Sequence, residues 1–309
     1  MARQNCKLSI LTLNTNGLNS PIKRQRLIEW IIKQDPTICC LQETHLTRKD
    51  AKKLKVKGWK KIFHANRREK KAGVAILISD EIDFILTNIK RDREGHFILV
   101  KGMIHQEAIT IINVYAPNLN APSYVKQLLT DLREDIDTRT ILVGDLNTPL
   151  TTMDRSTKQK LNKETTELTQ TIEQLDLVDI YRTFYPKATD YTFFSAVHGT
   201  FSRIDHMIGH KANLNNFQNI SIIPCTLSDH HGMKLEINNS KLPKKYTHSW
   251  KLNNMLLNEQ WVREEIKDEI KKIYGRALVG VLLPDKTPPG SRPQFPPQLW
   301  QALGFYDMK

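Results

Sequence analysis

Short apolar runs alternate with polar turn residues along most of the chain, from Leu8 to Ile237. Runs of this length, rich in β-branched residues and bounded by turn residues, predict β-strands. The expected strands cover residues 8–13, 37–41, 59–63, 73–78, 97–104, 108–115, 140–143, 203–208, 218–223 and 233–237.

Helices fit between some of these strands. Ser20 and Pro21 offer an N-cap followed by a proline in the first turn, and the apolar residues between Ile22 and Ile31 supply a buried face. Residues 123–136 and 163–177 are the other expected helices. Because the strands come in pairs with few helices between them, the pattern favours an α/β sandwich of two mixed sheets over a purely parallel sheet.

The pattern changes near Asn238. We expect a catalytic domain over residues 1–238, a peripheral helical extension over 239–273 and a disordered tail over 274–309. The tail is assigned on composition, because six of the fourteen prolines fall between positions 284 and 297.

Composition narrows the class of protein. The chain of 309 residues is 39% hydrophobic, and its longest apolar run, near residues 74–78, is far shorter than the ~20 residues that cross a membrane. Its first residues lack the apolar stretch of a secretory signal. The four cysteines show no Cys-x-x-Cys spacing, and adjacent Cys39 and Cys40 should point to opposite faces of a strand. We therefore expect no membrane association and a reducing compartment, the nucleus or the cytoplasm.

The net charge of +13 makes polyanions the expected partners. Twelve Lys or Arg residues lie between Arg48 and Lys71, and only two acidic residues oppose them. Trp59, Phe63 and His64 lie among these cations and would offer flat surfaces to bases. The alternative is that the charge serves solubility alone, but its clustering favours a nucleic acid.

Polar side chains stand at the ends of several predicted strands, where α/β sheets bind ligands. They are Asn14, Glu43, Tyr115, Asp145, Asn147, Asp229 and His230. Carboxylates, amides and a histidine at separate strand ends are the groups that a metal-assisted phosphodiester hydrolase uses. A hard cation such as Mg²⁺, which Mn²⁺ can replace, prefers such oxygen ligands.

Each of these residues has a functional and a structural interpretation. Glu43 fits a principal metal ligand, although a single Glu at a strand end is more often a solvated acid. Asp145 fits the group that orients and deprotonates water with the help of Asn147, but turns use the same residues. Tyr115 could donate to a phosphate oxygen or be a half-buried aromatic residue. Asn14 could hold Asp145 or a metal-bound water, or cap a turn.

A second carboxylate lies inside an apolar run. Asp205 stands between Ile204 and Met207, where a buried carboxylate needs a partner. We predict that Asp205 pairs with His230, which would hold the imidazolium charged and ready to bind the scissile phosphate. His206 and His231 are expected to stand outside the site.

The ordered motifs N-T-N-G, Q-E-T-H, N-V-Y-A-P, G-D-L-N, R-I-D-H and S-D-H resemble the exonuclease III, apurinic/apyrimidinic endonuclease and DNase I superfamily. The segments K-A-G-V-A-I-L-I-S-D, D-R-S-T-K-Q-K and Y-T-F-F-S-A are similar to the endonuclease domain that opens the second open-reading-frame protein of mammalian LINE retrotransposons. The resemblance covers residues from about 7 to about 272.

This resemblance implies a four-layered α/β sandwich and Mg²⁺-dependent nicking of double-stranded DNA that leaves a 3′-hydroxyl, with AT-rich preference, by a monomer. The implied catalytic residues are Asn14, Glu43, Tyr115, Asp145, Asn147, Asp205, Asp229 and His230. The candidate metal ligands among them are Glu43, Asn14, Asp145, Asn147, Asp229 and His230. The hairpin over residues 192–202 would probe the minor groove, with Arg155, Thr192 and Ser202 contacting DNA.

Two departures bear on the substrate. Asn16 stands where repair enzymes carry an aspartate, and Ser202 where one of them carries a tryptophan that lines the abasic pocket. These departures argue against specific abasic-site repair, which stays an alternative together with a catalytically idle DNA-binding remnant. A further alternative is an enzyme of the same fold that acts on lipids, either a phosphatase of inositol lipids or a sphingomyelinase. The tail from Ile273 matches nothing in the retrotransposon protein, so autonomous retrotransposition is not expected.

Overall fold

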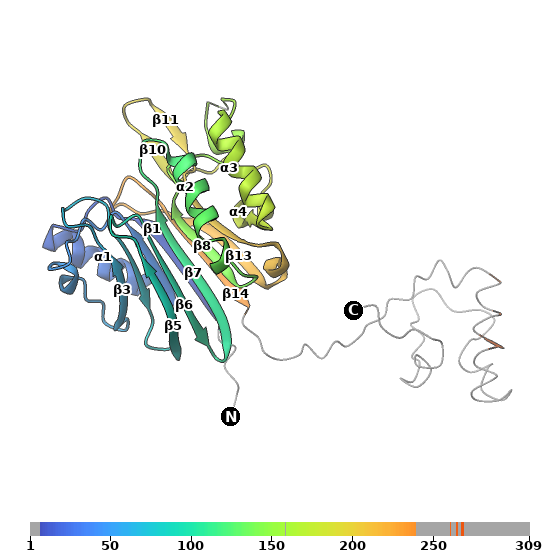
Figure 1. The fold of residues 1–309 in the computed structure, drawn as a ribbon, viewed down its shortest axis with the longest axis horizontal. Helices are drawn as coiled ribbons and strands as arrows, with labels where there is room; N and C mark the ends of the chain where they lie inside the picture. The colour runs from blue at the N-terminus through green and yellow to red at the C-terminus, as the bar shows by residue number, and fades with distance from the viewer. Residues whose placement is uncertain (1–6, 158, 239–259, 261–263, 265–266, 269–309) are drawn as a thin grey trace. The chain divides into compact units, whose positions relative to one another are not determined.

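The computed structural model describes residues 7–157 and 159–238, with residues 260, 264, 267 and 268. Between residues 7 and 238 the chain forms two six-stranded sheets and a separate two-stranded hairpin. The two sheets lie face to face, with helices on their outer sides (Figure 1). The predicted sandwich of two mixed sheets is confirmed.

The first sheet has the strand order β13-β14-β1-β2-β4-β3. In it, β1 and β2 are parallel and the other neighbouring strands are antiparallel. Its strands are β1 (Lys7–Asn14), β2 (Ile38–Gln42), β3 (Lys61–Ala65), β4 (Val74–Ile78), β13 (Phe217–Ile223) and β14 (Gly232–Asn238).

The second sheet has the order β5-β6-β7-β8-β12-β9, and only β7 and β8 are parallel among its described pairs. The hairpin of β10 and β11 extends from one end of the sandwich (Figure 1). The strands are β5 (Phe84–Arg91), β6 (Phe97–Ile104), β7 (Glu107–Tyr115), β8 (Thr140–Asp145), β9 (Leu177–Asp179), β10 (Phe193–Ser195), β11 (Thr200–Ser202) and β12 (Asp205–His210).

The first helix begins as the sequence predicts. The Ser20 side chain accepts a hydrogen bond from the backbone N–H of Lys23, Pro21 opens the first turn, and Asp35 closes the helix in the left-handed conformation. The α-helices are α1 (Pro21–Gln34), α2 (Ala121–Asp131), α3 (Lys163–Gln174) and α4 (Ile180–Phe184). The 3-10 turns are η1 (Ala51–Lys53), η2 (Arg133–Asp135), η3 (Thr152–Asp154) and η4 (Lys211–Asn216).

Three apolar clusters hold the layers together. One fills the space between the sheets, a second lies beneath α2 and α3, and a third lies beneath α1. Cys40 belongs to the cluster between the sheets and Cys39 to the cluster beneath α1, so the two side chains face opposite sides of β2 as predicted. Both thiols are free and buried.

The main differences from the predicted elements have physical causes. Strand β5 was missed because it is an edge strand whose apolar run, Phe84 to Leu86, is only three residues long and is followed by polar residues. The helix expected over 123–136 gives way to a 3-10 turn after Asp131, and the helix expected over 163–177 ends at Gln174, just before β9. The strand expected over 203–208 begins at Asp205.

The strands and helices described between residues 7 and 238 belong to one compact unit, Met1–Ser240. The extension expected over 239–273 and the tail over 274–309 lie outside the described residues, apart from four helical residues in the extension. Those two assignments stay predictions. Among the described residues, no helix has both the length and the apolar character needed to cross a membrane.

Candidate active site

The functional side chains gather where the parallel strands of both sheets end. Asn14 is the last residue of β1, Glu43 follows β2, and Tyr115 and Asp145 end β7 and β8. A polar bridge joins the sheets just below this edge. Gln42 donates to the Asn113 side chain at 2.6 Å, and Asn113 donates to the Leu41 carbonyl at 3.0 Å.

Gly144 brings the end of β8 against β7. Its φ is 131°, and a Cβ at this position would lie 2.0 Å from the Val114 carbonyl oxygen. Only glycine fits so close an approach of two backbones. The apolar run before G-D-L-N therefore predicts the strand, and its glycine allows Asp145 to sit beside Tyr115, its partner in the β7–β8 register.

Asn14 links the two carboxylates of the site. Its side-chain NH₂ group donates to Glu43 Oε1 at 2.9 Å and to Asp145 Oδ2 at 2.8 Å. Its Oδ1 accepts from the Asn16 backbone N–H at 2.9 Å, which fixes the orientation of the amide. Since Asn14 is fully buried, it is a rigid support that holds both acids at one place.

Glu43 is held as a carboxylate. Its backbone is in the left-handed conformation with φ of 46°, and its Oε2 lies 3.2 Å from His45 Nε2. Burial alone would raise the pKa of Glu43, but hydrogen bonds from His45, Asn14 and Tyr115 lower it on balance. No role was predicted for His45, although it closes the Q-E-T-H motif.

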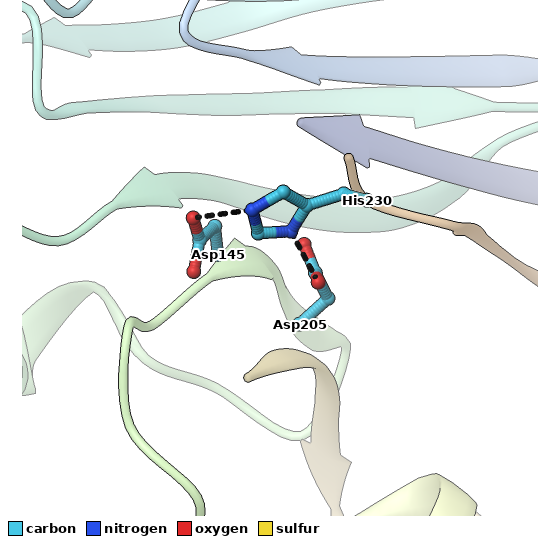
Figure 2. Close-up of side chains that lie close together, drawn as sticks. All are labelled: Asp145, Asp205 and His230. Carbon is cyan, nitrogen blue, oxygen red and sulfur yellow. Dashed lines mark hydrogen bonds and ion pairs between the residues drawn. The ribbon is translucent and has the colours of Figure 1, made fainter. Parts of the chain in front are cut away.

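His230 lies between two aspartates (Figure 2). Its Nδ1 is 2.8 Å from Asp205 Oδ2, so the predicted pair is present, and its Nε2 is 3.9 Å from Asp145 Oδ2. The Phe193 ring packs against the imidazole, 4.8 Å between centroids. The three polar side chains are almost fully buried.

The pKa values of Asp145 and His230 are shifted strongly from their ordinary values. Burial raises the pKa of Asp145, and the neighbouring Asp205 charge raises it further, to about 7. Burial would lower the pKa of His230, but Asp205 and Asp145 raise it to about 10. Asp205 Oδ1 is buried and has no hydrogen-bond partner among the residues that the structure describes. Charged and partly unsatisfied groups of this kind mark functional sites.

The donor set fits a hard divalent cation. Asp145, Asp205 and His230 each offer an atom within 4.8 Å of the others and together could hold a metal ion. Because the pKa of His230 is raised, its imidazole is protonated at neutral pH and repels a cation. The carboxylates that Asn14 links, Glu43 and Asp145, present the oxygen atoms that Mg²⁺ prefers, and among the described residues Glu43 forms no ion pair with His230.

The family model described as Endonuclease/Exonuclease/phosphatase family matches residues 11–230. The chain belongs to this family. The match includes every residue of the trio and strands of both sheets, although β14 lies beyond its end, and it indicates a nuclease or phosphatase hydrolase. The predicted superfamily is thereby confirmed.

Two curated relatives are similar in sequence. The transposon TX1 uncharacterized 149 kDa protein of Xenopus laevis is 26% identical over 268 residues, covering 84% of this chain but 20% of that protein. A DNA-(apurinic or apyrimidinic site) endonuclease of Dictyostelium discoideum is 26% identical, covering 69% of this chain and 65% of that protein. The chain thus spans less than two thirds of either relative.

Among solved structures, the catalytic domain of Xenopus laevis APE2 superposes with a TM-score of 0.61 at 21% identity. The superposition covers 75% of this chain and 92% of that chain. At this identity the similarity shows the fold, and it agrees with the two sheets and flanking helices of this member of the family.

Asn147 and Asp229 flank the buried centre. The Asn147 backbone N–H donates to Asp145 Oδ1 at 2.8 Å, while its side-chain NH₂ donates to the Ala116 carbonyl. Asn147 therefore orients the carboxylate of Asp145. Asp229 is exposed at the mouth of the site, where its Oδ1 accepts from the Asn16 amide at 3.1 Å.

The three residues predicted to contact DNA lie at the base of the β10–β11 hairpin. Arg155 and Ser202 pair through an isolated β-bridge, and both are half-buried. Thr192 is only 1% exposed, and its hydroxyl accepts from the backbone N–H groups of Ile204 and Asp205. A side-chain contact of Thr192 with DNA is therefore wrong for this conformation. The residue instead supports the strand that carries Asp205.

The basic stretch from Arg48 to Lys71 is also corrected in part. Most of its Lys and Arg side chains are exposed, as a DNA-facing surface requires. Trp59, however, is only 5% exposed and donates its indole N–H to the Pro36 carbonyl, and Phe63 packs against Phe84. These rings serve the core, because the alternation of charged and apolar residues follows the strand rather than a stacking surface.

A buried cluster behind the site was not predicted. Arg203 is fully buried and bonds Asp154 and Asp179 at 2.7 Å each, and its Nη1 lies 3.0 Å from His206. Arg182 also pairs with Asp154. The only signal in the sequence was the arginine that opens R-I-D-H.

Proposed function

We propose that this chain is a metal-dependent endonuclease that nicks double-stranded DNA. The observation that carries the proposal is the convergence of Glu43 and Asp145 on one Asn14 amide, with His230 beside Asp145. Attack on a phosphodiester needs a deprotonated water and stabilisation of the charge that develops on phosphorus. These groups offer both within one small region.

Each residue has a part that its contacts support. Asp145, with a pKa raised to about 7, is placed to accept the proton of the attacking water. The backbone N–H of Asn147 and the Asn14 amide hold its two oxygens in place. His230, kept charged by Asp205, is placed to bind a phosphate oxygen.

A hard divalent cation such as Mg²⁺ or Mn²⁺, held by oxygens of Glu43 and Asp145, would supply Lewis-acid stabilisation of the phosphate when bound. Tyr115 stands beside Glu43, to which it is hydrogen bonded, with its ring stacked on His96 at 5.6 Å. We assign the Tyr115 hydroxyl to a phosphate oxygen of the substrate. Asp229 is the remaining acidic group at the mouth.

We further propose the retroelement type of this activity, with an AT-rich preference and a 3′-hydroxyl product. The relative named as a transposon TX1 protein matches over 84% of this chain. Asn16 and Ser202 stand in place of the residues expected in abasic-site repair. A monomeric enzyme working in the nucleus is consistent with this substrate.

Abasic-site cleavage is the second candidate, favoured by a relative named as an apurinic or apyrimidinic site endonuclease. The two candidates make different predictions for an intact AT-rich duplex and for the same duplex carrying one abasic site. The retroelement type should cut both at similar rates. A repair enzyme should cut only the second.

The test is a plasmid-nicking assay with Mg²⁺ on the parent chain, Asp145→Ala and His230→Ala. The proposal expects relaxed circles from the parent alone, with ends that a polymerase can extend. DNA binding without nicking by any of the three would favour an idle remnant. Turnover of a phosphoinositide in place of DNA would favour the phosphatase.

A further inference from the structure

A lysine stands at the mouth of the site beside the acidic groups. Lys23 lies in the first turn of α1, and its ammonium donates to the Asn16 backbone carbonyl at 2.8 Å. The side chain is half-buried, although most of the lysines whose burial is described are exposed. The fold therefore draws this ammonium back toward the active-site loop instead of extending it into water.

The surroundings of Lys23 place it on the Asp229 side. Asp229 and Glu43 both act on the ammonium through their charges, so the group lies in the field of the site. Among the residues described between positions 7 and 238, no carboxylate comes within ion-pair distance of it. An ammonium has three donors, and one is used by Asn16.

Asp229, the carboxylate whose charge acts most on Lys23, accepts hydrogen bonds from other groups. Asp229 Oδ1 accepts from the Asn16 side chain at 3.1 Å and from Ser228 at 3.2 Å. An asparagine at position 16 thus occupies Asp229 with a neutral donor. It leaves the lysine charge available to an anion that approaches the mouth of the site.

We propose that Lys23 binds a phosphate oxygen of the DNA substrate on the Asp229 side of the active site. This inference rests on the proposed nuclease function and adds a binding residue to it. An ammonium is a point charge with rotatable donors, which suits a phosphate whose exact orientation varies. Burial lowers the pKa of Lys23 on balance, while the charges of Asp229 and Glu43 act to raise it, so a phosphate would give this partly desolvated cation a charged partner.

The experiment measures binding of a short AT-rich duplex in Mg²⁺ on the Asp145→Asn background, where the duplex stays uncut. Lys23→Met keeps the aliphatic stem and removes the charge. We expect its affinity to fall about 10- to 100-fold, the range of one charge-assisted hydrogen bond. The slope of log affinity against log salt should fall by about 0.9, the value for one phosphate contact.

Two further variants make the result specific. Lys33→Met makes the same charge change on the same helix, about 15 Å away in an exposed last turn, and should leave affinity within about twofold. Lys23→Arg keeps the charge and should retain the salt slope. The thermal midpoint of each variant shows that it is folded.

Equal affinities and salt slopes for Lys23→Met and Lys33→Met would overturn the inference about Lys23. Failure of the nuclease function gives a different pattern, because the parent chain itself would then not nick plasmid DNA in Mg²⁺. A parent that nicks, together with a Lys23→Met variant that behaves as Lys33→Met, contradicts only the inference.

Discussion

Two buried clusters, each with aspartates and a histidine, lie close together in this fold. They differ in how well the negative charges are balanced by positive ones. In the structural cluster, Arg203 lies between Asp154 and Asp179, with His206 and Arg182 completing the pairs. In the site cluster, Asp145 and Asp205 face one imidazole, that of His230. The first cluster contains two guanidinium groups, and the second contains none.

The pKa directions record the difference. Burial would raise the pKa of Asp179 and of Asp154, but Arg203 lowers the pKa of Asp179 well below its ordinary value and lowers that of Asp154 as well. Burial and Asp205 together raise the pKa of Asp145. A matched cluster fixes structure, whereas an undermatched one retains the ability to take up protons and cations.

The largest effect on this comparison should come from removing the central cation of the matched cluster. Arg203→Met leaves two buried carboxylates without their partner, so the free energy of unfolding should fall by about 3–5 kcal/mol. Chemical denaturation of the variant measures it. Arg133→Met, an exposed site in η2, is the control and should change stability by less than about 0.5 kcal/mol. Equal stability of the two variants would show that the buried cluster is not structural.

The next effect concerns the imidazole of the site. Asp205→Asn removes the anion that raises the pKa of His230 most, so that pKa should fall from about 10 toward 6.5. Plasmid nicking should slow about 10²- to 10³-fold, the loss typical for a misoriented charge-stabilising group. The alkaline limb of the pH–rate profile should move to lower pH.

Asp176→Asn makes the same change on an exposed loop and should leave rate and profile unaltered. An Asp205→Asn profile that keeps the parent's alkaline limb would mean that Asp205 does not act through His230.

The two clusters should lose stability at opposite ends of the pH scale. The folded-state pKa values of Asp154 and Asp179 are lowered, so their stabilisation is present above the ordinary value of 3.8 and is lost as pH falls through the folded values. The folded-state pKa of His230 is raised, so its contribution is complete below 6.5 and is lost as pH rises through about 10.

Each proton changes the free energy of unfolding by up to about 1.4 kcal/mol per pH unit. Denaturant titrations of Asp179→Asn should therefore show a shallower acid slope than the parent, and those of His230→Gln a shallower alkaline slope. Slopes that change at the same end of the scale in both variants would contradict the separation of the clusters.

The smallest effect should show whether Thr192, at the hairpin, supports the neighbouring strand or contacts DNA. Thr192→Val removes the acceptor of two buried backbone N–H groups through bonds of 3.2 and 3.3 Å, so stability should fall by about 1 kcal/mol. DNA affinity of the folded variant should match the parent. Ser202→Ala, at a half-buried hairpin position, should lower DNA affinity and leave stability unchanged. Lost affinity with unchanged stability in Thr192→Val would restore the predicted contact.

Local patterns in the sequence were sufficient to predict the strand ends of the site. The apolar run before Asp145 can be read from one short segment of the sequence, and so can the buried position of Asp205. Strand β5 was missed because its apolar run covers only three residues, too short to be told from a loop by pattern alone. Which charges are buried together depends on tertiary packing, and this is why Arg203 and Lys23 went unnoticed and Trp59 was assigned to the surface.

The most direct test makes one Asp→Asn substitution in each cluster and measures the nicking rate and the thermal midpoint of each variant. Asp145→Asn should lower the single-turnover nicking rate in Mg²⁺ by about 10³-fold and leave the thermal midpoint unchanged or higher, because a costly buried carboxylate is removed. Asp179→Asn should lower the midpoint while each folded molecule nicks at nearly the parent's rate. An Asp145→Asn variant that unfolds readily, or that nicks as fast as the parent, would contradict the account.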